Sequence, residues 1–248
     1  MKKLAQIASY PLSVIFYLLF GLNLVIFDVI QRVCLNVFGY QAHKKSVDIF
    51  NGISLILMRV FLFTKFTIND NANAPINTPI LFVSNHQSMW EIVAIVWYLR
   101  RYHPKFISKK ELGKGIPTIS YNLKRGGSAL IDRKDREQAV LQLENFAKYL
   151  NKTKRSGVLF AEGTRSRDNT MKPFKPAGLI TLIENLNDDA YIVPISISNS
   201  WKLQSKGNFP IPLGVSFKLT THPAIKKADQ PIEQLIQELE NIVRDGIS

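Results

Sequence analysis

Apolar residues occur in one long run at the start of the chain and in short runs, separated by polar segments, over the rest of it. The long run, residues 4–27, contains 24 residues and no charge. As a helix it would be about 36 Å long, and the hydrocarbon core of a bilayer is about 30 Å thick. A second apolar run, residues 53–63, has only 11 residues and includes Arg59. The pattern predicts membrane-associated N-terminal helices, with the second run interfacial or re-entrant.

Basic residues beside these runs indicate how the helices meet a membrane. Lys2 and Lys3 precede the first run, and Lys44 and Lys45 lie between the two. A hairpin with two spans would carry Lys44 and Lys45 across the membrane, against the tendency of basic residues to stay on the cytoplasmic side. We therefore predict that residues 1–67 form a helical hairpin in one leaflet. One alternative is a pair of helices that only pack on a soluble core, and a cleaved signal peptide is disfavoured by the length of the run.

After the helices the pattern changes twice. Residues 68–79 (INDNANAPINTP) have no apolar period and are typical of a linker. From residue 80 to 248, short apolar strands alternate with helices, which predicts an α/β domain with a mixed sheet flanked by helices. Asp135 and Gln138 form a capping pair at the start of one of these helices. We expect strands near 80–83, 106–107, 128–131, 158–160, 192–197 and 215–219, and helices at 88–100, after 135 and after 231.

Charge is concentrated in the middle of the chain. The formal net charge is +13, and residues 100–175 hold 19 basic and 7 acidic side chains. This concentration indicates a site for phosphate or an acidic surface, against the alternative of a solvated basic face. The single cysteine, Cys34, excludes an internal disulfide, and four scattered histidines do not form a zinc cluster. We predict no metal site and a catalytic domain in a reducing compartment.

The first candidate site is the segment SNHQSMWE, residues 84–91, which follows a buried strand and opens a helix. Strand ends that lead into helices are common places for α/β active sites. His86 is a candidate general base, because an unperturbed histidine with a pKa of about 6.5 accepts a proton at neutral pH. Glu91 can orient it if His86 lies in the turn ahead of the helix. The alternative for Glu91 is structural, since Ser88 and Glu91 also fit a capping box.

The second candidate site is the segment VLFAEGTRSR, residues 158–167, another apolar strand that ends in a polar turn. Arg165 can hold a phosphate through two N–H donors, and Thr164 and free backbone N–H groups can complete the cradle. The chain has neither a Walker loop nor a strand followed by Gly-x-Gly-x-x-Gly. Nucleoside triphosphate and NAD chemistry are therefore disfavoured.

Together these segments resemble the glycerolipid acyltransferases, and lysophosphatidic acid acyltransferases most of all. The resemblance covers roughly residues 80–200 and rests on blocks in the same order. They are NHQS with a carboxylate five residues after the histidine, KKEL at 109–112, IDR at 131–133, the block around EGTRSR at 162–167, and PFK-x-x-G at 173–178. Two residues depart from the family pattern. Ala161 stands where proline is usual, and Glu91 replaces the usual aspartate.

The resemblance implies a role for each matching residue. His86 and Glu91 are expected to form the catalytic dyad. The residues expected to bind the phosphate of the acceptor are Lys109, Arg133, Glu162, Gly163, Thr164 and Arg165. No cofactor is implied, because acyl-CoA or acyl carrier protein enters as a co-substrate.

We therefore expect a 1-acylglycerol-3-phosphate O-acyltransferase. His86 would deprotonate the free hydroxyl of a lysophospholipid, with lysophosphatidic acid as the favoured acceptor and phosphatidic acid as the product. No protein nucleophile is required, because Cys34 lies away from every motif and Ser88 has no independent reason to be activated. The expected location is the cytoplasmic face of the inner (cell) membrane, with anionic lipids as partners.

Two alternatives remain open at this point. The acceptor could be another lysolipid or a lyso-aminolipid, and the protein could be a non-catalytic, basic membrane-binding module. A nucleic-acid partner is disfavoured, because the basic residues are not interleaved with a platform of aromatic residues. A serine esterase that uses Ser88 would need Gly-x-Ser-x-Gly, which is absent.

Overall fold

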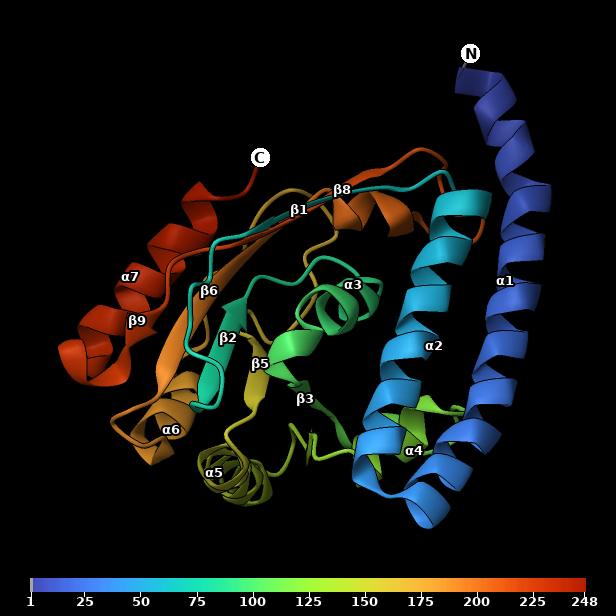
Figure 1. Ribbon diagram of the computed structural model, residues 1–248. Coiled ribbons are helices and arrows are strands. Elements are labelled where there is room, and N and C mark those ends of the chain that lie inside the picture. Colours follow the sequence, from blue (N-terminus) through green and yellow to red (C-terminus); the bar gives the residue numbers. More distant parts are fainter. Residues whose placement is uncertain (1) are drawn as a thin grey trace.

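The computed structural model of the protein describes residues 2–248, and it begins with two long antiparallel helices (Figure 1). Helix α1 (Lys2–Val33) is joined to α2 (Tyr40–Phe61) by a π-helical turn, Cys34–Phe38, and by Gly39. The chain reverses at Gly39, whose φ of 80° lies in the left-handed region that glycine adopts without strain. The predicted helical hairpin is therefore present.

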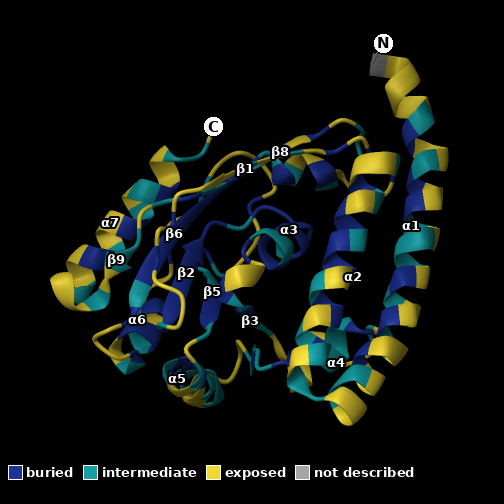
Figure 2. Ribbon diagram, viewed as in Figure 1, coloured by how far each residue is buried: buried dark blue, intermediate teal, exposed yellow. Residues whose placement is uncertain are grey.

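A buried polar contact holds the two helices together. The amide nitrogen of Asn23 on α1 donates to the carbonyl of Phe50 at 3.3 Å and to the hydroxyl of Ser54 at 3.1 Å, both on α2. The opposite face of α1 is apolar and exposed (Figure 2). Within the described residues, the helical segment Lys3–Phe38 is the one that has the length and composition to cross a membrane. An exposed apolar helix of this kind suggests association with a membrane.

The second apolar run is only partly interfacial, contrary to the prediction. Leu55, Met58 and Leu62 are buried in the core of the α/β domain, while Ile56 and Val60 are exposed. Residues three, four and seven apart share one face of a helix, so one face of this run packs inward and the other faces out. Helix α2 thus belongs to the core on one side and extends the exposed apolar surface of α1 on the other.

The predicted mixed sheet is confirmed. Its strands follow the order β1-β8-β6-β2-β5-β3-β4, with β9 paired to β6. The central pairs β6–β2, β2–β5, β5–β3 and β3–β4 are parallel, and β6 is antiparallel to β8. The strands are β1 (Lys65–Asp70), β2 (Ile80–Ser84), β3 (Pro104–Lys109), β4 (Ala129–Ile131), β5 (Ser156–Phe160), β6 (Tyr191–Ser198), β8 (Ser216–Thr221) and β9 (Ile225–Lys226), with β7 (Ser205–Asn208) outside the sheet.

One strand lies where a linker was predicted. Strand β1 pairs in parallel with β8, so residues 68–70 belong to the sheet and the connection to β2 is only 71–79. Phe66 and Ile68 pack against the core and alternate with exposed residues, which is the period of two that a strand shows. This alternation is short, and the polar residues that follow it hide it in the sequence. The predicted boundary after residue 67 therefore falls inside a strand.

Helices cover both faces of the sheet. Successive residues of β2 point to opposite faces, so Phe82 joins a core with α2 and α3 (Glu91–Tyr98), while Leu81 and Val83 join another. That second core is built on α5 (Arg136–Thr153), α6 (Pro176–Asn185) and α7 (Ile232–Asp245). Helix α4 (Ile119–Arg125) lies beside the lower end of the hairpin (Figure 1). The predicted cap of α5 is present, because the Asp135 side chain accepts from the Gln138 N–H.

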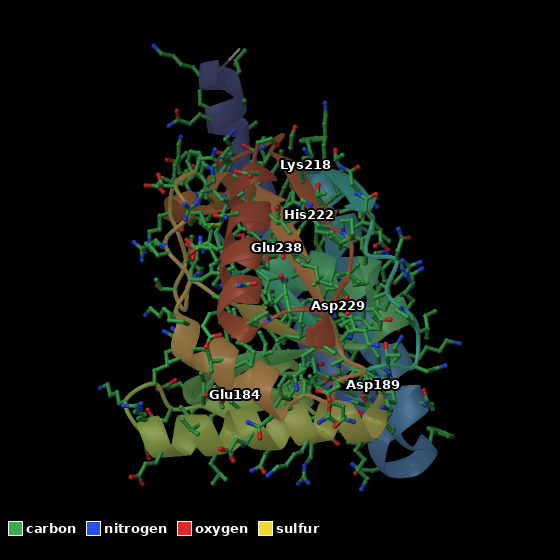
Figure 3. The ribbon with its side chains drawn as sticks, turned by 90° about the vertical axis from the view of Figure 1, so that its left-hand side faces the viewer. Glu184, Asp189, Lys218, His222, Asp229 and Glu238 are labelled. Carbon is green, nitrogen blue, oxygen red and sulfur yellow. The ribbon has the colours of Figure 1, made fainter. Side chains whose placement is uncertain are left out.

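The last helix packs against the sheet beside β6, on the side away from the hairpin (Figure 3). Leu235, Leu239 and Val243 of α7 point inward, and Glu238 is exposed. The hydroxyl of Ser196 on β6 donates to the carbonyl of Val243 at 2.9 Å. This contact anchors the C-terminal end of α7 to the strand next to β2.

Candidate active site

The candidate base lies in a turn between the central strand β2 and helix α3. All five residues of β2 are buried, and α3 begins at Glu91, three residues later than predicted. Inside the turn, the side chain of Asn85 accepts from the N–H of Ile197 and donates to its carbonyl, each at 2.8 Å. These two hydrogen bonds resemble those between paired strands. They attach the turn that carries His86 to β6 and so to the rigid sheet.

The structure brings His86 and Glu91 together. Nδ1 of His86 lies 2.6 Å from Oε2 of Glu91, whose side chain is fully buried, while 16% of the His86 side chain is exposed. The ring of Phe160 stacks on the imidazole with the ring centroids 4.0 Å apart. A carboxylate can only accept, so Nδ1 carries the proton and Nε2 has the free lone pair. That nitrogen is suited to take a proton from a substrate hydroxyl.

The other oxygen of Glu91 closes the turn. Oε1 accepts from the backbone N–H groups of Gln87 and Ser88, each at 2.7 Å, and from the hydroxyl of Ser200. The carboxylate therefore orients His86 with one oxygen and satisfies free N–H groups ahead of α3 with the other. The capping and orienting roles weighed from the sequence coexist in this one side chain.

Glu162 lies two residues after the end of β5 and faces the same turn. Its Oε1 accepts from the backbone N–H of His86 at 2.7 Å, and its Oε2 accepts from the N–H of Lys172 at 2.9 Å and from the hydroxyl of Ser166. The side chain is buried, and a carboxylate repels a phosphate. The geometry thus favours a positioning role for Glu162 over the predicted contact with the acceptor phosphate.

The other predicted phosphate-binding residues gather at the adjoining strand ends. Arg133, just after β4, donates through Nη1 to the carbonyl of Gly163, and partial burial lowers the pKa of its guanidinium. Arg165 is exposed and donates through Nη1 to Oε1 of Gln204 at 3.1 Å. Thr164, between Gly163 and Arg165, is also exposed. The ends of β4 and β5 therefore present two guanidinium groups and a hydroxyl to solvent beside the His86 turn.

Lys109 belongs to the same edge of the sheet. It is the exposed last residue of β3, directly opposite Ile131 at the end of β4. Strands β2, β5, β3 and β4 are parallel, so their carboxyl ends meet at one edge, where α/β sites form. Because Lys109 pairs with Ile131, it lies close to Arg133, which is two residues further along the chain.

Three neighbours of this site were not singled out from the sequence. The side chain of Lys175 lies over Gly163, where a Cβ added to the glycine would be 2.9 Å from its Cδ. Phe160 stacks on His86, and Ser200 contacts Glu91. Lys175 and Phe160 lie inside the recognised blocks and could have been inferred from them. Ser200 is 109 residues from Glu91 with no local motif, so only the fold reveals it.

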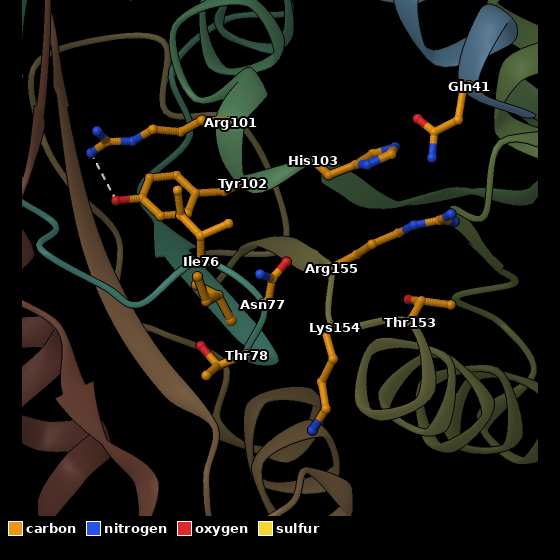
Figure 4. A pocket seen from close by; sticks show the side chains of 11 residues that line it. Gln41, Ile76, Asn77, Thr78, Arg101, Tyr102, His103, Thr153, Lys154 and Arg155 are labelled. Carbon is orange, nitrogen blue, oxygen red and sulfur yellow. Dashed lines mark hydrogen bonds between the residues drawn. The ribbon is translucent and has the colours of Figure 1, made fainter.

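A separate cavity of about 230 Å³ lies at the opposite edge of the sheet, near the start of β2 (Figure 4). Its two most exposed cations point away from one another, Arg101 towards Asp70 at 2.7 Å and Lys154 towards Asp189 at 3.0 Å. Neither His86 nor Glu91 lines this cavity, so it is separate from the candidate catalytic pair. In residues 2–248 no group of three or more metal-ligating His, Cys, Asp or Glu side chains is present.

A turn with a histidine–carboxylate pair beside exposed guanidinium groups, at the carboxyl edge of a mixed α/β sheet, defines a candidate acyl-transfer site. Residues 65–198 match the acyltransferase family. The match covers more than half of the chain, so the chain belongs to the acyltransferase family.

Curated relatives match the same region. The 1-acyl-sn-glycerol-3-phosphate acyltransferase BAT2, chloroplastic, of Brassica napus is 31% identical over 150 residues, which cover 60% of this chain and 42% of the relative. The 1-acyl-sn-glycerol-3-phosphate acyltransferase of Saccharomyces cerevisiae is 31% identical over 131 residues, which cover 51% of this chain and 41% of the relative. The chain thus spans about two fifths of the length of these relatives.

A solved structure shares the fold over almost the whole chain. The crystal structure of the 1-acyl-sn-glycerophosphate (LPA) acyltransferase PlsC from Thermotoga maritima superposes with a TM-score of 0.78 at 22% identity. The match covers 98% of this chain and 95% of the other. It includes the N-terminal helices as well as the sheet, so the whole architecture described above recurs there.

Proposed function

We propose that the protein transfers a fatty acyl group from acyl-CoA or acyl carrier protein to the free hydroxyl of lysophosphatidic acid, forming phosphatidic acid. The observation that carries this proposal is the pairing of His86 with the buried Glu91, beside the guanidinium groups of Arg133 and Arg165. A base beside a phosphate-binding turn fits an acceptor that carries both a hydroxyl and a phosphate. The names of the relatives in Brassica napus and Saccharomyces cerevisiae support this acceptor.

The proposed reaction is a direct transfer. Nε2 of His86 takes the proton of the acceptor hydroxyl as its oxygen attacks the carbonyl carbon of the thioester. The new C–O bond forms, the C–S bond breaks, and the thiolate takes the proton from the imidazolium. Glu91 holds the ring by Nδ1 and stabilises the imidazolium through its negative charge. No covalent acyl-enzyme is needed, so Ser88 has no nucleophilic role.

Acceptor binding follows from the charges beside the base. Arg165 can grip the phosphate with two parallel N–H donors, and Arg133, Lys109 and Thr164 add charge and a hydroxyl nearby. A phosphate held there would direct the glycerol hydroxyl of the same molecule towards His86. The residues at the carboxyl ends of β2, β3, β4 and β5 thus bind and activate the acceptor together.

The same proposal places the enzyme on the cytoplasmic face of the inner membrane. The exposed apolar face of α1 would lie in one leaflet, and the basic residues 100–175 would meet anionic lipid headgroups. A lysolipid acceptor resides in that leaflet, while acyl-CoA or acyl carrier protein arrives from the water. Both donors are anionic and are attracted by the same positive charge.

An acyl-transfer assay across acceptors and donors tests the proposal. The full chain in mixed micelles is given acyl-CoA or acyl carrier protein with lysophosphatidic acid, lysophosphatidylcholine or a lyso-aminolipid, and the lipid products are separated. We expect phosphatidic acid from lysophosphatidic acid at the highest kcat/KM. Transfer to another lysolipid alone would overturn the acceptor, and no transfer from either donor would overturn the enzymatic function.

A further inference from the structure

A short segment after β6 contacts both the turn that carries His86 and the turn that carries Arg165. It is η4 (Ser200–Gln204), a 3₁₀ helix that starts directly after Asn199. Asn199 has a φ of 66°, a left-handed conformation that asparagine tolerates and that turns the chain back towards the His86 turn. Leu203 of η4 is fully buried in the core beneath the segment. Burial of Leu203 thus holds the segment on the core, and the polar side chains of Ser200 and Gln204 can contact the candidate site.

Ser200 contacts the turn that carries the base. Its hydroxyl donates to Oε1 of Glu91, and its backbone N–H donates to the side-chain oxygen of Gln87 at 3.1 Å. Both Ser200 and Glu91 are fully buried, so no water can replace a lost donor. The hydroxyl therefore helps to hold the Glu91 carboxylate in the orientation that places Oε2 against His86.

Gln204, at the other end of η4, contacts Arg165 in the turn after β5, where the acceptor phosphate is proposed to bind. Its side-chain oxygen accepts from Nη1 of Arg165 at 3.1 Å and from the backbone N–H of Met89 at 3.2 Å. Its nitrogen donates to Oδ1 of Asn208 at 2.7 Å, which fixes the orientation of the amide. One amide thus links Arg165 to the turn that contains the base.

We infer that η4 is the element that sets the base and the phosphate-binding arginine at a fixed separation, with Ser200 and Gln204 as positioning residues for the acyl transfer. Ser200 acts on His86 through Glu91, and Gln204 acts on the acceptor through Arg165. This inference rests on the proposed function for its kinetic consequences. It assigns Ser200 to the chemical step and Gln204 to binding of the acceptor. Substitution of Ser200 should therefore change kcat, and substitution of Gln204 should change the KM of the acceptor.

The expected signatures follow from those contacts. Ser200→Ala should lower kcat by about 10- to 100-fold with both KM values nearly unchanged, the range typical of supporting hydrogen bonds to a reactive group. Gln204→Met keeps the length of the side chain but removes the oxygen, so it should raise KM for the acceptor by about 10-fold with little effect on kcat. Ser200→Thr retains a hydroxyl and should restore a substantial part of kcat.

Ser198→Ala is the matched control. Ser198 is a fully buried serine two residues away, and its hydroxyl accepts from the N–H of Ser248 instead of contacting Glu91. We expect Ser198→Ala to keep wild-type kcat and KM. If Ser200→Ala and Ser198→Ala give the same kinetics, the positioning role of Ser200 is wrong. If Gln204→Met leaves the acceptor KM unchanged, the role of Gln204 is wrong.

A second readout separates this inference from the proposed function. Diethyl pyrocarbonate modifies neutral histidines, and mass spectrometry of the peptides gives the rate at His86, with His43, His103 and His222 as internal references. With the Glu91 carboxylate less firmly held, His86 should react faster in Ser200→Ala than in wild type, and Ser198→Ala should not change it. An unchanged rate at His86 would overturn the inference even if the wild type transfers acyl groups. A faster rate would support it even if the acceptor proves to be a different one, and a slower rate would contradict it.

Discussion

Nδ1 of His86 lies 2.6 Å from Oε2 of Glu91, and this contact crosses from the turn after β2 to the first residue of α3. The other oxygen of Glu91 is occupied by the N–H groups of Gln87 and Ser88 and by the hydroxyl of Ser200. Each oxygen of this buried carboxylate therefore has a different task. The arrangement fixes which atom of any replacement side chain must face the imidazole.

Glu91→Gln should abolish most of the activity because it reverses the tautomer of His86. Three donors surround the position of Oε1, so the amide oxygen must take that place and the NH₂ group must face Nδ1. Nδ1 then has to accept, the proton moves to Nε2, and the lone pair needed for the hydroxyl is lost. The expected loss in kcat is about 10⁴-fold, as for the equivalent change in a serine protease triad. Steady-state kinetics and melting curves measure it.

Glu91→Asp is the companion variant, because it keeps the charge and shortens the side chain by one methylene. Aspartate is the residue expected from the family pattern, so a substantial part of kcat should remain. A Glu91→Gln enzyme with wild-type kcat would show that Glu91 only caps α3. If the two variants lose activity to the same extent and also lower the melting temperature to the same extent, the role of Glu91 is structural alone.

Arg165→Ala should weaken use of the acceptor more than use of the donor. Arg165 is exposed beside the base, and the loss of a bidentate contact leaves the phosphate poorly held. We expect KM for lysophosphatidic acid to rise by about 10- to 100-fold, equivalent to about 1.4–2.8 kcal/mol. Kinetics with each substrate varied in turn measure the effect. A rise confined to the KM of the donor would contradict the assignment.

Several local features of the fold could be predicted because they are encoded by neighbouring residues. Strand β2 is a buried apolar run, and the cap of α5 by Asp135 follows from residues three apart. The pairing of His86 with Glu91 also follows from their separation of five residues where the strand leads into a helix. Each of these features can be recognised from residues fewer than six positions apart in the sequence, although β2 itself pairs with the distant strands β5 and β6.

Other features depend on contacts between distant parts of the chain. Strand β1 pairs with β8, about 150 residues later, so the polar segment 68–79 predicts a linker although residues 68–70 belong to the strand. Glu162 was grouped with the phosphate-binding residues because it lies in their motif, but the fold turns its side chain towards the N–H of His86. Ser200 has no motif at all.

Leu18→Ser combined with Leu22→Ser should release the protein from membranes without unfolding it. These side chains on α1 are 69% and 55% exposed, so they contribute little to the folded core. Each leucine buried in a bilayer contributes about 1.5–3 kcal/mol, so the partition coefficient should fall at least 10-fold. Co-sedimentation with anionic liposomes measures it. Unchanged binding with an unchanged melting temperature would show that α1 is not the anchor.

Phe16→Ala serves as the contrasting variant on the same helix. Phe16 is fully buried, with its ring centroid 5.3 Å from that of Trp90 in the domain core. We expect this variant to lose about 3–5 kcal/mol of stability. Point substitutions are preferable to removal of the hairpin, because α2 also supplies Leu55 and Met58 to the core.

Lys105→Met should stabilise the protein, and the gain should depend on pH. Lys105 is buried on β3 with its Nζ 5.3 Å from the centre of the Tyr40 ring. Burial and the nearby charge of Arg155 lower the pKa of Lys105 from 10.5 to about 7, and Asp48 opposes the shift only in part. Replacement of buried charged groups by apolar side chains of similar volume is often neutral or stabilises proteins by about 1–4 kcal/mol, and a methionine at this position has no ammonium group to desolvate.

The sign of the pH dependence follows from where the proton binds. Between pH 7 and 10.5 the unfolded chain holds a proton on Lys105 that the folded protein has released, so wild-type stability rises with pH in this window. The variant lacks that slope. Its advantage in melting temperature should therefore be largest at pH 7 and shrink towards pH 10. An advantage that is constant over this range would contradict the burial of an uncompensated ammonium group.

The transfer rate of His86→Ala tests the central claim most directly. The full chain in mixed micelles is given a thioester donor and lysophosphatidic acid, and phosphatidic acid is quantified for wild type and variant at equal folded concentration. The loss of a general base costs about 10²- to 10⁴-fold in rate, so kcat should fall within that range while the melting temperature stays close to that of the wild type. A His86→Ala protein that forms phosphatidic acid at the wild-type rate would show that His86 is not the base.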